Sequence, residues 1–311
     1  MVTSPPGKSG RMTPRTSLLT RRGFLAAAAS VLAAQGSAAA GAAPLRVATV
    51  DWALLETLLA IGVVPVAATE LTMFRRIAVE PEVPASVVDI GLRGSPNYEA
   101  LRLARPDLVL SSNYYAWAEA KLRLVAPVER ISIYGTGEQP FKAAEEATLR
   151  LGRETGQDHE AERTIAETHA ELDRFRDAIA GGDGRPLLLI NLGDAHHFRV
   201  FGSDSMFGNV LTRLGLRNAW TARTSYAASA PLGLETLAGM PDAWIVIIPP
   251  IPPDAQRALP RSAFWNALPN VKAGRVLTLE SVNPFGGMPA GLRFARLLAG
   301  ALSRAVQESR S

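Results

Sequence analysis

The chain has 311 residues, 47% of them hydrophobic, and contains no cysteine. This composition indicates a globular protein with room for two domains, and it excludes a disulfide scaffold and thiol chemistry. The formal net charge is +4, but five basic and no acidic residues lie in residues 1–43, and the remaining 28 basic and 29 acidic residues give −1. A basic surface for nucleic acid is therefore not expected.

Residues 1–43 have the layout of a cleaved export signal. Arg21 and Arg22 precede an uncharged, mostly apolar run of 11 residues, and small residues then lead to Pro44. That run is shorter than the roughly 20 residues that a membrane-spanning helix needs. The paired arginines favour twin-arginine export, with an ordinary secretory signal as the alternative. We expect cleavage near Ala40 or Ala43 and a protein that works in the periplasm.

Residues 44–138 are predicted to form an N-terminal lobe, because short apolar runs alternate there with helical patterns. This alternation indicates a mostly parallel sheet covered by helices on both faces. The expected strands and helices are, in chain order, the strand 45–50, the helix 53–61, the strands 64–68 and 87–90, the helix 97–104, the strand 107–110, the helix 116–125 and the strand 130–134.

Residues 139–183 are predicted to be a connecting helical segment, polar on one face and interrupted only around Gly152 and Gly156. Residues 184–311 return to the alternating pattern and are predicted to form a C-terminal lobe. Its expected elements are the strands 187–192 and 199–201, the helix 206–214, the strands 244–248 and 275–279, and a closing helix at 290–306. The predicted fold class is therefore α/β, with two lobes joined by a long helix and a ligand cleft between them.

One short element occurs once in each lobe. Glu99 and Glu235 each stand near the start of a short helical segment, which a Pro-Asp pair ends before a buried strand begins. Glutamate favours a first helical turn for electrostatic reasons alone. Two similarly placed carboxylates on two lobes would, however, also suit docking on a basic partner.

Signatures of catalysis and of tightly held cofactors are missing from the sequence. There is no GxSxG nucleophile motif, and the glycine-rich turns lack the spacing of a phosphate-binding loop. His196 and His197 are adjacent, so in a strand they would face opposite sides and could not converge on one metal ion. We therefore expect neither enzyme activity nor a resident metal or cofactor.

Aromatic and guanidinium groups instead follow the predicted strands. Trp52 follows the first strand, Arg93 lies in a loop after the strand 87–90, and Tyr114 and Tyr115 follow the strand 107–110. Ligands of open α/β sheets bind at the carboxyl ends of the strands. These side chains are therefore predicted to form the rim of a binding site.

At this point the sequence resembles a known family, the periplasmic ferric-hydroxamate (ferrichrome-type) siderophore-binding proteins of iron uptake ABC transporters. The resemblance runs from about Val47 to the C-terminal helix. It rests on the order and spacing of several blocks: Trp52–Gly62, Val88–Arg93, Arg185–Leu189, Val200–Gly202, Asn218–Trp220 and Ala273–Arg275. It implies the helical-backbone type of periplasmic binding protein, with a shallow cleft between the lobes and little closure on binding.

The resemblance also assigns roles. Arg93 and Tyr115 correspond to side chains that hydrogen-bond the iron-hydroxamate oxygens, and Glu99 and Glu235 to the glutamates that dock on an inner-membrane permease, which works with its ATPase. The siderophore supplies every iron ligand, so the protein needs no metal ligands. The protein is expected to be a monomer. The remaining expected ligand contacts are Trp52, Tyr226, Asn283 and Phe285.

The pocket wall departs from the family. Ile77, Ala227 and Asn283 stand where ferrichrome binders carry tryptophans, whereas Trp52 is kept. A siderophore backbone other than that of ferrichrome is therefore expected. The alternatives are a binding protein for a catecholate siderophore, haem or a corrinoid, or an exported α/β enzyme, which would need an acid–base or nucleophile set in its cleft.

Overall fold

The computed structural model describes residues 1, 3, 44–135, 139–222, 224 and 231–310. The chain separates into the compact units Met1–Pro44 and Leu45–Ser311, and the second carries the two five-stranded sheets. The twin-arginine motif, Tyr226 and Ala227 lie outside the described residues. The domain boundaries expected at residues 43, 138 and 183 stay predictions.

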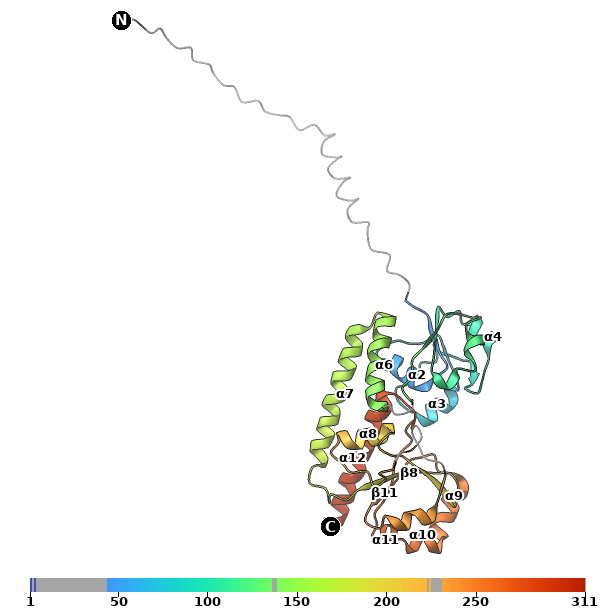
Figure 1. Ribbon diagram of the computed structural model, residues 1–311, viewed down its shortest axis with the longest axis vertical. Helices are drawn as coiled ribbons and strands as arrows, with labels where there is room; N and C mark the ends of the chain where they lie inside the picture. The colour runs from blue at the N-terminus through green and yellow to red at the C-terminus, as the bar shows by residue number, and fades with distance from the viewer. Residues whose placement is uncertain (2, 4–43, 136–138, 223, 225–230, 311) are drawn as a thin grey trace. The chain divides into compact units, whose positions relative to one another are not determined.

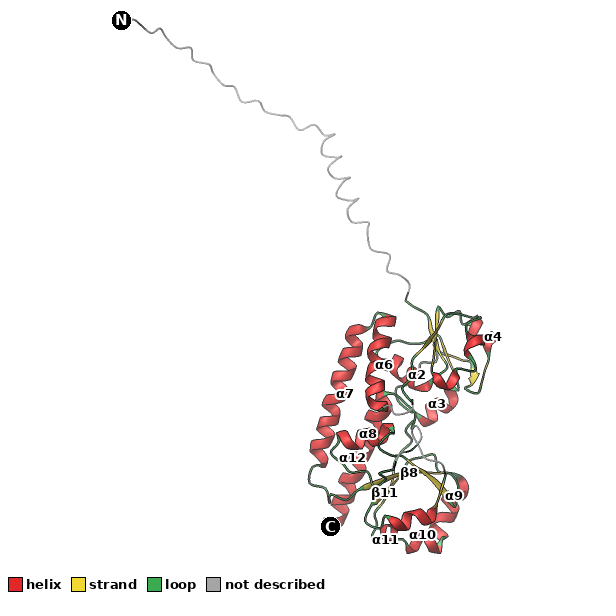
Figure 2. Cartoon of the chain, viewed as in Figure 1, coloured by secondary structure: helices red, strands yellow, loops and turns green. Residues whose placement is uncertain are grey.

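The first sheet contains five parallel strands in the order β3-β2-β1-β6-β7. Its strands are drawn in yellow beside α4 in Figure 2. Strand β1 lies in the middle and pairs with β2 on one side and β6 on the other. The direction of winding therefore reverses at β1, and the carboxyl ends of β1 and β6 form the switch point at which open sheets bind ligands. The strands are β1 (Val47–Thr49), β2 (Ala67–Ala68), β3 (Val88–Asp89), β6 (Leu108–Ser111) and β7 (Val128–Arg130).

Helices with well-formed caps connect these strands. Asp51 begins α2 by accepting hydrogen bonds from the backbone N–H groups of Ala53 and Leu54, and Asn97 caps α4 in the same way. The sequence did not predict α3 or the β4–β5 hairpin, because two-residue strands and a seven-residue helix carry little periodicity. The connecting elements are α2 (Trp52–Ala60), α3 (Leu71–Ile77), β4 (Gly91–Leu92), β5 (Ser95–Pro96), α4 (Tyr98–Leu103), η1 (Asn113–Tyr115) and α5 (Glu119–Leu122).

Two long helices, α6 (Pro140–Thr155) and α7 (Asp158–Ile179), fill the connecting segment and lie side by side (Figure 1). Gly156 ends α6 in a left-handed conformation, with φ +69°. Gly152 stays helical, and its missing side chain makes room for Ala161 of α7. Helix α7 also packs against α12 (Met288–Arg310), which closes the chain.

The second sheet has the order β10-β9-β8-β11-β12, in which β8, β11 and β12 are parallel and β9 is antiparallel to both of its neighbours, β8 and β10. Its strands are β8 (Leu187–Leu192), β9 (His197–Val200), β10 (Leu232–Gly233), β11 (Trp244–Ile247) and β12 (Val276–Thr278). Its helices are α8 (Met206–Arg213), η2 (Leu234–Gly239), α9 (Pro253–Ala258), η3 (Leu259–Arg261), α10 (Ala263–Ala267) and α11 (Pro269–Lys272), of which those after β11 were too short to predict from sequence. The predicted class, two α/β lobes joined by a long helix, is confirmed, and the connection contains two long helices, α6 and α7.

One apolar core runs through both lobes. It includes Leu54 of α2, Phe141 of α6, Phe207 of α8 and Phe294 of α12, and the rings of Phe207 and Phe294 stack with centroids 4.4 Å apart.

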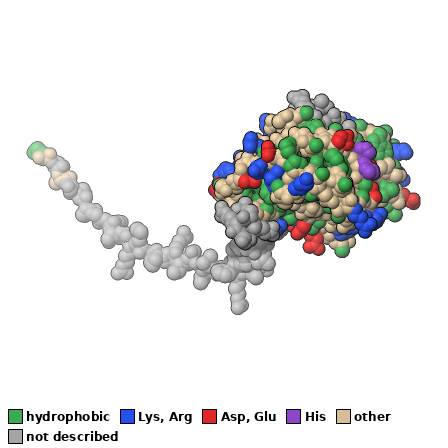
Figure 3. All heavy atoms as spheres, turned by 90° about the horizontal axis from the view of Figure 1, so that it is seen from below, with side chains coloured by type: hydrophobic (Ala, Val, Ile, Leu, Met, Phe, Trp, Pro, Cys, Tyr) green, Lys and Arg blue, Asp and Glu red, His purple; other side chains and the backbone are tan. Residues whose placement is uncertain are grey.

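In the face drawn in Figure 3, acidic and basic side chains are interspersed among apolar ones. Among the described residues, no helix has the length and apolar character needed to cross a membrane.

Candidate ligand-binding site

Polar and aromatic side chains gather where the strands of the first sheet end. Trp52 follows β1, Glu70 follows β2, and Tyr115 follows β6 in the turn η1. Arg93 lies after β3, in the tight turn of the β4–β5 hairpin. The structure therefore brings Arg93, Tyr115 and Trp52, three of the residues expected from sequence, to the switch point of this sheet.

Arg93 is the centre of this group. Its guanidinium carbon lies 3.8 Å from the centroid of the Trp52 ring, which is a close cation–π contact. Its Nε donates to Oε2 of Glu70 at 2.5 Å, and 38% of its side chain remains exposed. A guanidinium has five N–H donors, so these contacts hold Arg93 in place and leave donor capacity for a ligand.

Tyr115 lies beside Arg93 and is 8% exposed. Burial raises the pKa of the Tyr115 hydroxyl, and the negative charge of Asp51 raises it further, whereas the charge of Arg93 and its hydrogen bond to Tyr115 lower it. The hydroxyl is therefore protonated at neutral pH and can act as a donor. Burial also raises the pKa of Asp51, against hydrogen bonds from Ser112 and from the backbone of α2 that lower it.

Trp52 is almost fully buried, so it supports Arg93 and contributes little surface to the site. The side chain is 4% exposed, its Nε1 donates to the Thr69 carbonyl at 3.0 Å, and its ring meets the edge of Phe74. Ile77, one of the positions that depart from the family, packs partly buried against the same apolar cluster. A ligand would therefore meet Arg93 before it met Trp52.

The segment Asn283–Gly287, just before α12, brings the second lobe to this edge. Phe285 is 38% exposed, and its ring lies edge-on to Tyr134 with centroids 5.8 Å apart. The Tyr134 hydroxyl donates to the Gly286 carbonyl at 2.7 Å. Asn283 is 2% exposed and points away from solvent, so it has a structural position in this structure, while Phe285 offers an exposed ring.

A buried carboxylate holds that segment in place. Glu56 of α2 is fully buried and accepts hydrogen bonds from Nδ2 of Asn283 at 2.7 Å and from the Gly287 N–H at 2.8 Å. A Cβ at Gly286 would collide with this carboxylate, and one at Gly287 would collide with the Thr57 hydroxyl. Burial raises the pKa of Glu56 to about 8, although both hydrogen bonds act to lower it.

An ion-pair cluster joins the lobes a second time. Glu80, which follows α3, pairs with Arg293 at 2.8 Å and with Arg296 at 2.6 Å, both from α12. Arg293 is only 6% exposed and also donates to the Ser281 carbonyl. These contacts and the Glu56 contacts hold the carboxyl edges of the two sheets together.

Sequence reasoning missed several members of this group. Glu70 and Asp51 follow strands as Arg93 does, so the strand-end rule could have found both. Glu56 lies inside a helix and gave no signal. Trp117, 57% exposed just after η1, offers a second exposed ring at the same strand end as Tyr115.

Glu99 and Glu235 are both exposed, in the first turns of α4 and η2. Each element leads into a central strand, β6 or β11, which matches the repeat seen in the sequence. The Glu235 carboxylate lies close over Gly233, where a Cβ would collide with it.

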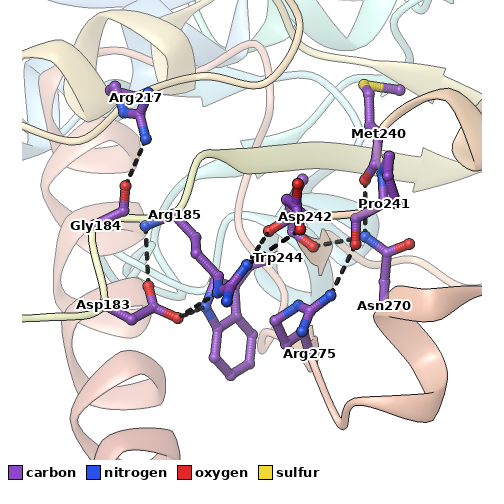
Figure 4. Close-up of polar contacts among 11 residues, drawn as sticks. Asp183, Gly184, Arg185, Arg217, Met240, Pro241, Asp242, Trp244, Asn270 and Arg275 are labelled. Atoms are coloured by element: carbon purple, nitrogen blue, oxygen red, sulfur yellow. Dashed lines mark hydrogen bonds and ion pairs between the residues drawn. The ribbon is translucent and has the colours of Figure 1, made fainter.

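A separate hollow of about 690 Å³ lies at the amino ends of β8 and β11, the edge of the second sheet away from Asn283–Gly287. Several of its polar groups are hydrogen-bonded (Figure 4): Asp183 pairs with Arg185 at 3.3 Å and accepts from Nε1 of Trp244 at 3.0 Å, and one terminal nitrogen of Arg275 donates to the Pro241 carbonyl at 2.8 Å, whereas the buried Nε of Arg275 has no partner among the described residues. These contacts fix the chain that leaves α7 onto the second sheet.

The histidines do not form a metal site. His197 begins β9, and its Nδ1 lies 3.0 Å from the Asp194 carboxylate. Among the described residues, no three histidine, aspartate or glutamate side chains gather as metal ligands.

Two α/β lobes that meet at the carboxyl ends of their strands, with a polar and aromatic group there, define a two-lobed binding protein. The periplasmic binding protein family model matches residues 47–282, and the chain belongs to that family. Its members are substrate-binding proteins of transport systems.

Curated relatives cover most of the chain. The iron(3+)-hydroxamate-binding protein FhuD of Escherichia coli is 30% identical over 92% of this chain and 97% of its own. The achromobactin-binding periplasmic protein of Dickeya dadantii is 24% identical over 77% of this chain and 79% of its own.

Solved structures show the same fold. The siderophore-binding protein FhuD of Vibrio cholerae with Fe³⁺-Desferal superimposes with a TM-score of 0.79 at 25% identity, covering 84% of this chain and 98% of that one. The triscatecholate siderophore-binding protein FeuA of Bacillus subtilis, with ferri-bacillibactin, gives 0.67 at 19% identity, with coverages of 83% and 92%. At that identity, the FeuA match supports the fold alone.

The buried Glu56 generates a prediction about pH. Its pKa is about 8 in the folded protein against an ordinary 4.5, so the folded state holds a proton that the unfolded chain releases between these values. The stability that this proton contributes is fully present below pH 4.5 and is lost as pH rises towards 8. We expect the wild type to lose several kcal/mol, at most about 5, from this group over that range.

Urea unfolding between pH 5 and 9 measures the effect, with Glu56→Gln as the comparison. The variant should show a flatter decline, and the part that remains reports Asp51, whose pKa is raised in the same direction. Equal pH slopes for the two proteins would show that Glu56 is already ionised throughout this range.

Proposed function

We propose that the protein is a periplasmic substrate-binding protein that captures a ferric hydroxamate siderophore and delivers it to an inner-membrane ABC permease for iron uptake. The observation that carries the proposal is the Arg93–Tyr115 donor pair at the switch point of the first sheet. The E. coli relative, an iron(3+)-hydroxamate-binding protein, supports the ligand class.

The chemistry of the pair suits this ligand. A hexadentate siderophore fills the iron coordination shell, so its hydroxamate oxygens accept hydrogen bonds while the iron stays bound to the siderophore. The guanidinium of Arg93 can donate to more than one of these oxygens, and the protonated Tyr115 hydroxyl adds one further donor. The exposed rings of Phe285 and Trp117 can cover apolar parts of the siderophore.

A catecholate siderophore, haem or a corrinoid is the alternative ligand. Ile77 stands where ferrichrome binders carry a tryptophan, which favours a ligand other than ferrichrome. The same fold carries a triscatecholate siderophore in FeuA. An exported enzyme has less support, because the polar groups of the site are engaged in positioning Arg93 and joining the lobes.

Tryptophan fluorescence of the mature protein tests the ligand class. We expect saturable quenching by ferric desferrioxamine and other ferric hydroxamates, none by haem, and far weaker binding of a ferric triscatecholate, seen only at high ligand concentration. Arg93→Ala should weaken hydroxamate binding about 10–100-fold, because charge-assisted hydrogen bonds contribute roughly 1.5–3 kcal/mol. Arg163→Ala is the matched control, since Arg163 is an exposed, ion-paired arginine on α7.

Thermal unfolding of each variant checks that both remain folded. Unchanged hydroxamate affinity in Arg93→Ala would remove Arg93 from the site. Quenching by haem or the catecholate alone would overturn the hydroxamate assignment while leaving the family unaffected.

Delivery to the permease is proposed to use Glu99 and Glu235, one exposed carboxylate from each lobe, against basic residues of the permease. The protein would act as a monomer that presents both carboxylates at once. Charge reversal of both, Glu99→Lys with Glu235→Lys, should leave siderophore affinity unchanged and abolish uptake of ⁵⁵Fe-siderophore by cells. Glu160→Lys on α7 serves as the surface-charge control. Normal uptake by the double variant would refute this docking surface.

Export is proposed to use the twin-arginine route, because Arg21 and Arg22 precede the apolar run of the signal. Replacing both arginines by lysine keeps the charge and removes the paired guanidinium groups. We expect the variant to accumulate in the cytoplasm, as cell fractionation would measure. Its continued appearance in the periplasm would favour the ordinary secretory route.

A further inference from the structure

Glu70 is the acidic partner of Arg93 and occupies an unusual backbone position. It begins α3 with φ +52°, in the left-handed region that residues other than glycine seldom adopt. Its backbone N–H donates to the Gly91 carbonyl at 2.8 Å. Asp89 braces the same junction, because its carboxylate accepts from the N–H groups of Leu71 and Gly91 at 3.0 and 2.9 Å.

This framework ties Glu70 to the hairpin that carries Arg93. The start of α3 and the hairpin are joined through backbone hydrogen bonds, so the carboxylate and the guanidinium start from fixed points. The Glu70 side chain is 20% exposed, and it contacts the Nε edge of the guanidinium. With the Trp52 ring against one face of the guanidinium, Arg93 is held from two directions.

Glu70 also changes the charge that a ligand meets. Arg93 alone would present one positive charge, whereas the Arg93–Glu70 pair presents N–H donors with no net charge. Asp51 lies near enough for the charge of Arg93 to lower its pKa, so a further carboxyl belongs to the same surroundings. The site therefore combines donors with a neutral to negative electrostatic environment.

Siderophore classes differ in the charge of their iron complexes. Three hydroxamates, each a monoanion, neutralise Fe³⁺, and a pendant ammonium as in ferric desferrioxamine makes the complex cationic. Three catecholates, each a dianion, leave the complex a trianion. A donor pair without net charge suits the first class, whereas an uncompensated arginine would favour the trianion.

We propose that Glu70 is a positioning and specificity-determining residue, which holds Arg93 against Trp52 and cancels its charge so that the site selects neutral or cationic ferric trishydroxamates over trianionic triscatecholates. The proposal rests on the proposed function for the identity of the site. Two variants distinguish the positioning role of Glu70 from the effect of its charge. Glu70→Gln keeps an oxygen that can accept from Nε but removes the charge, and Glu70→Ala removes both.

The positioning part is measured without ligand. In protein labelled with [¹⁵N]arginine, the Nε–H resonance of Arg93 is assigned by its absence in Arg93→Ala. We expect it to be shifted and protected from exchange in the wild type and in Glu70→Gln, and to move to an exposed position in Glu70→Ala. An unchanged resonance in Glu70→Ala would show that Glu70 does not hold Arg93.

The specificity part is measured by fluorescence titration of the wild type and both variants with ferric desferrioxamine and ferri-bacillibactin at low and high salt. Glu70→Gln should keep its hydroxamate affinity within about threefold and gain about tenfold for the catecholate, with the gain lost at high salt. Glu70→Ala should lose about tenfold for the hydroxamate. A purely structural role would change both ligands by the same factor at both salt concentrations.

Failure of the proposed function gives a different result. A wild type that binds no ferric hydroxamate overturns the proposed ligand class and, with it, the selection of hydroxamates, whatever the variants do. A wild type that binds hydroxamate, together with a Glu70→Gln variant that gains nothing for the catecholate, refutes the charge selection alone.

Discussion

The hydrogen bonds of the buried Glu56 carboxyl group are the interactions on which the geometry of the candidate ligand site depends. Glu56 lies on α2, in the first lobe, and holds Asn283 and the Gly287 N–H of the segment that leads into α12. The glycines at 286 and 287 let this segment approach α2, because a side chain at either position would meet Glu56 or Thr57. Phe285 therefore reaches the edge of the first sheet, beside Tyr134.

Burying a carboxyl group is unfavourable unless hydrogen bonds replace its hydration. Here the cost is met by two donors from the second lobe, so Glu56 is satisfied only while the lobes stay together. The apolar core that runs from α2 through α6 and α8 to α12 also holds the lobes together. Such a junction favours a cleft that is formed before the ligand arrives and moves little on binding.

Arg93 and its neighbours lie at the junction of the lobes that these contacts stabilise. The guanidinium rests on the buried Trp52 and is held at its Nε edge by Glu70, so few rotamers remain to be lost when a ligand binds. The Tyr115 hydroxyl, whose ordinary pKa of 10 already keeps it protonated at neutral pH, has that pKa raised further by burial and by Asp51, so it acts as a donor. The result is a compact donor surface with little net charge, which accounts for how a protein of this family could hold an already complexed iron without metal ligands of its own.

Much of the fold and part of the candidate site could be predicted from sequence, because strands and long helices leave a periodic apolar pattern. Apolar periodicity gave most strands of both sheets and the closing helix, but it placed the last strand of the first sheet at 130–134 instead of Val128–Arg130 and missed the two-residue β10. The rule that ligands bind at strand ends led to Arg93, Trp52 and the pair Tyr114 and Tyr115, from which the resemblance selected Tyr115. The same rule would have reached Glu70, but the short α3 and the β4–β5 hairpin that place it against Arg93 have no periodic signal. The sequence pattern also does not show in which direction a side chain points. Asn283 was therefore expected in the pocket wall, whereas the structure buries it against Glu56.

A crystal structure of the mature protein with ferric desferrioxamine would test the central claim, that the Arg93–Tyr115 pair binds the iron-hydroxamate oxygens. We expect hydroxamate oxygens within hydrogen-bond distance of the Arg93 guanidinium and the Tyr115 hydroxyl, with Glu70 still on Nε and the Glu56 contacts unchanged. A siderophore seated in the hollow beside Trp244 and Arg275, or bound without contact to Arg93, would contradict the claim.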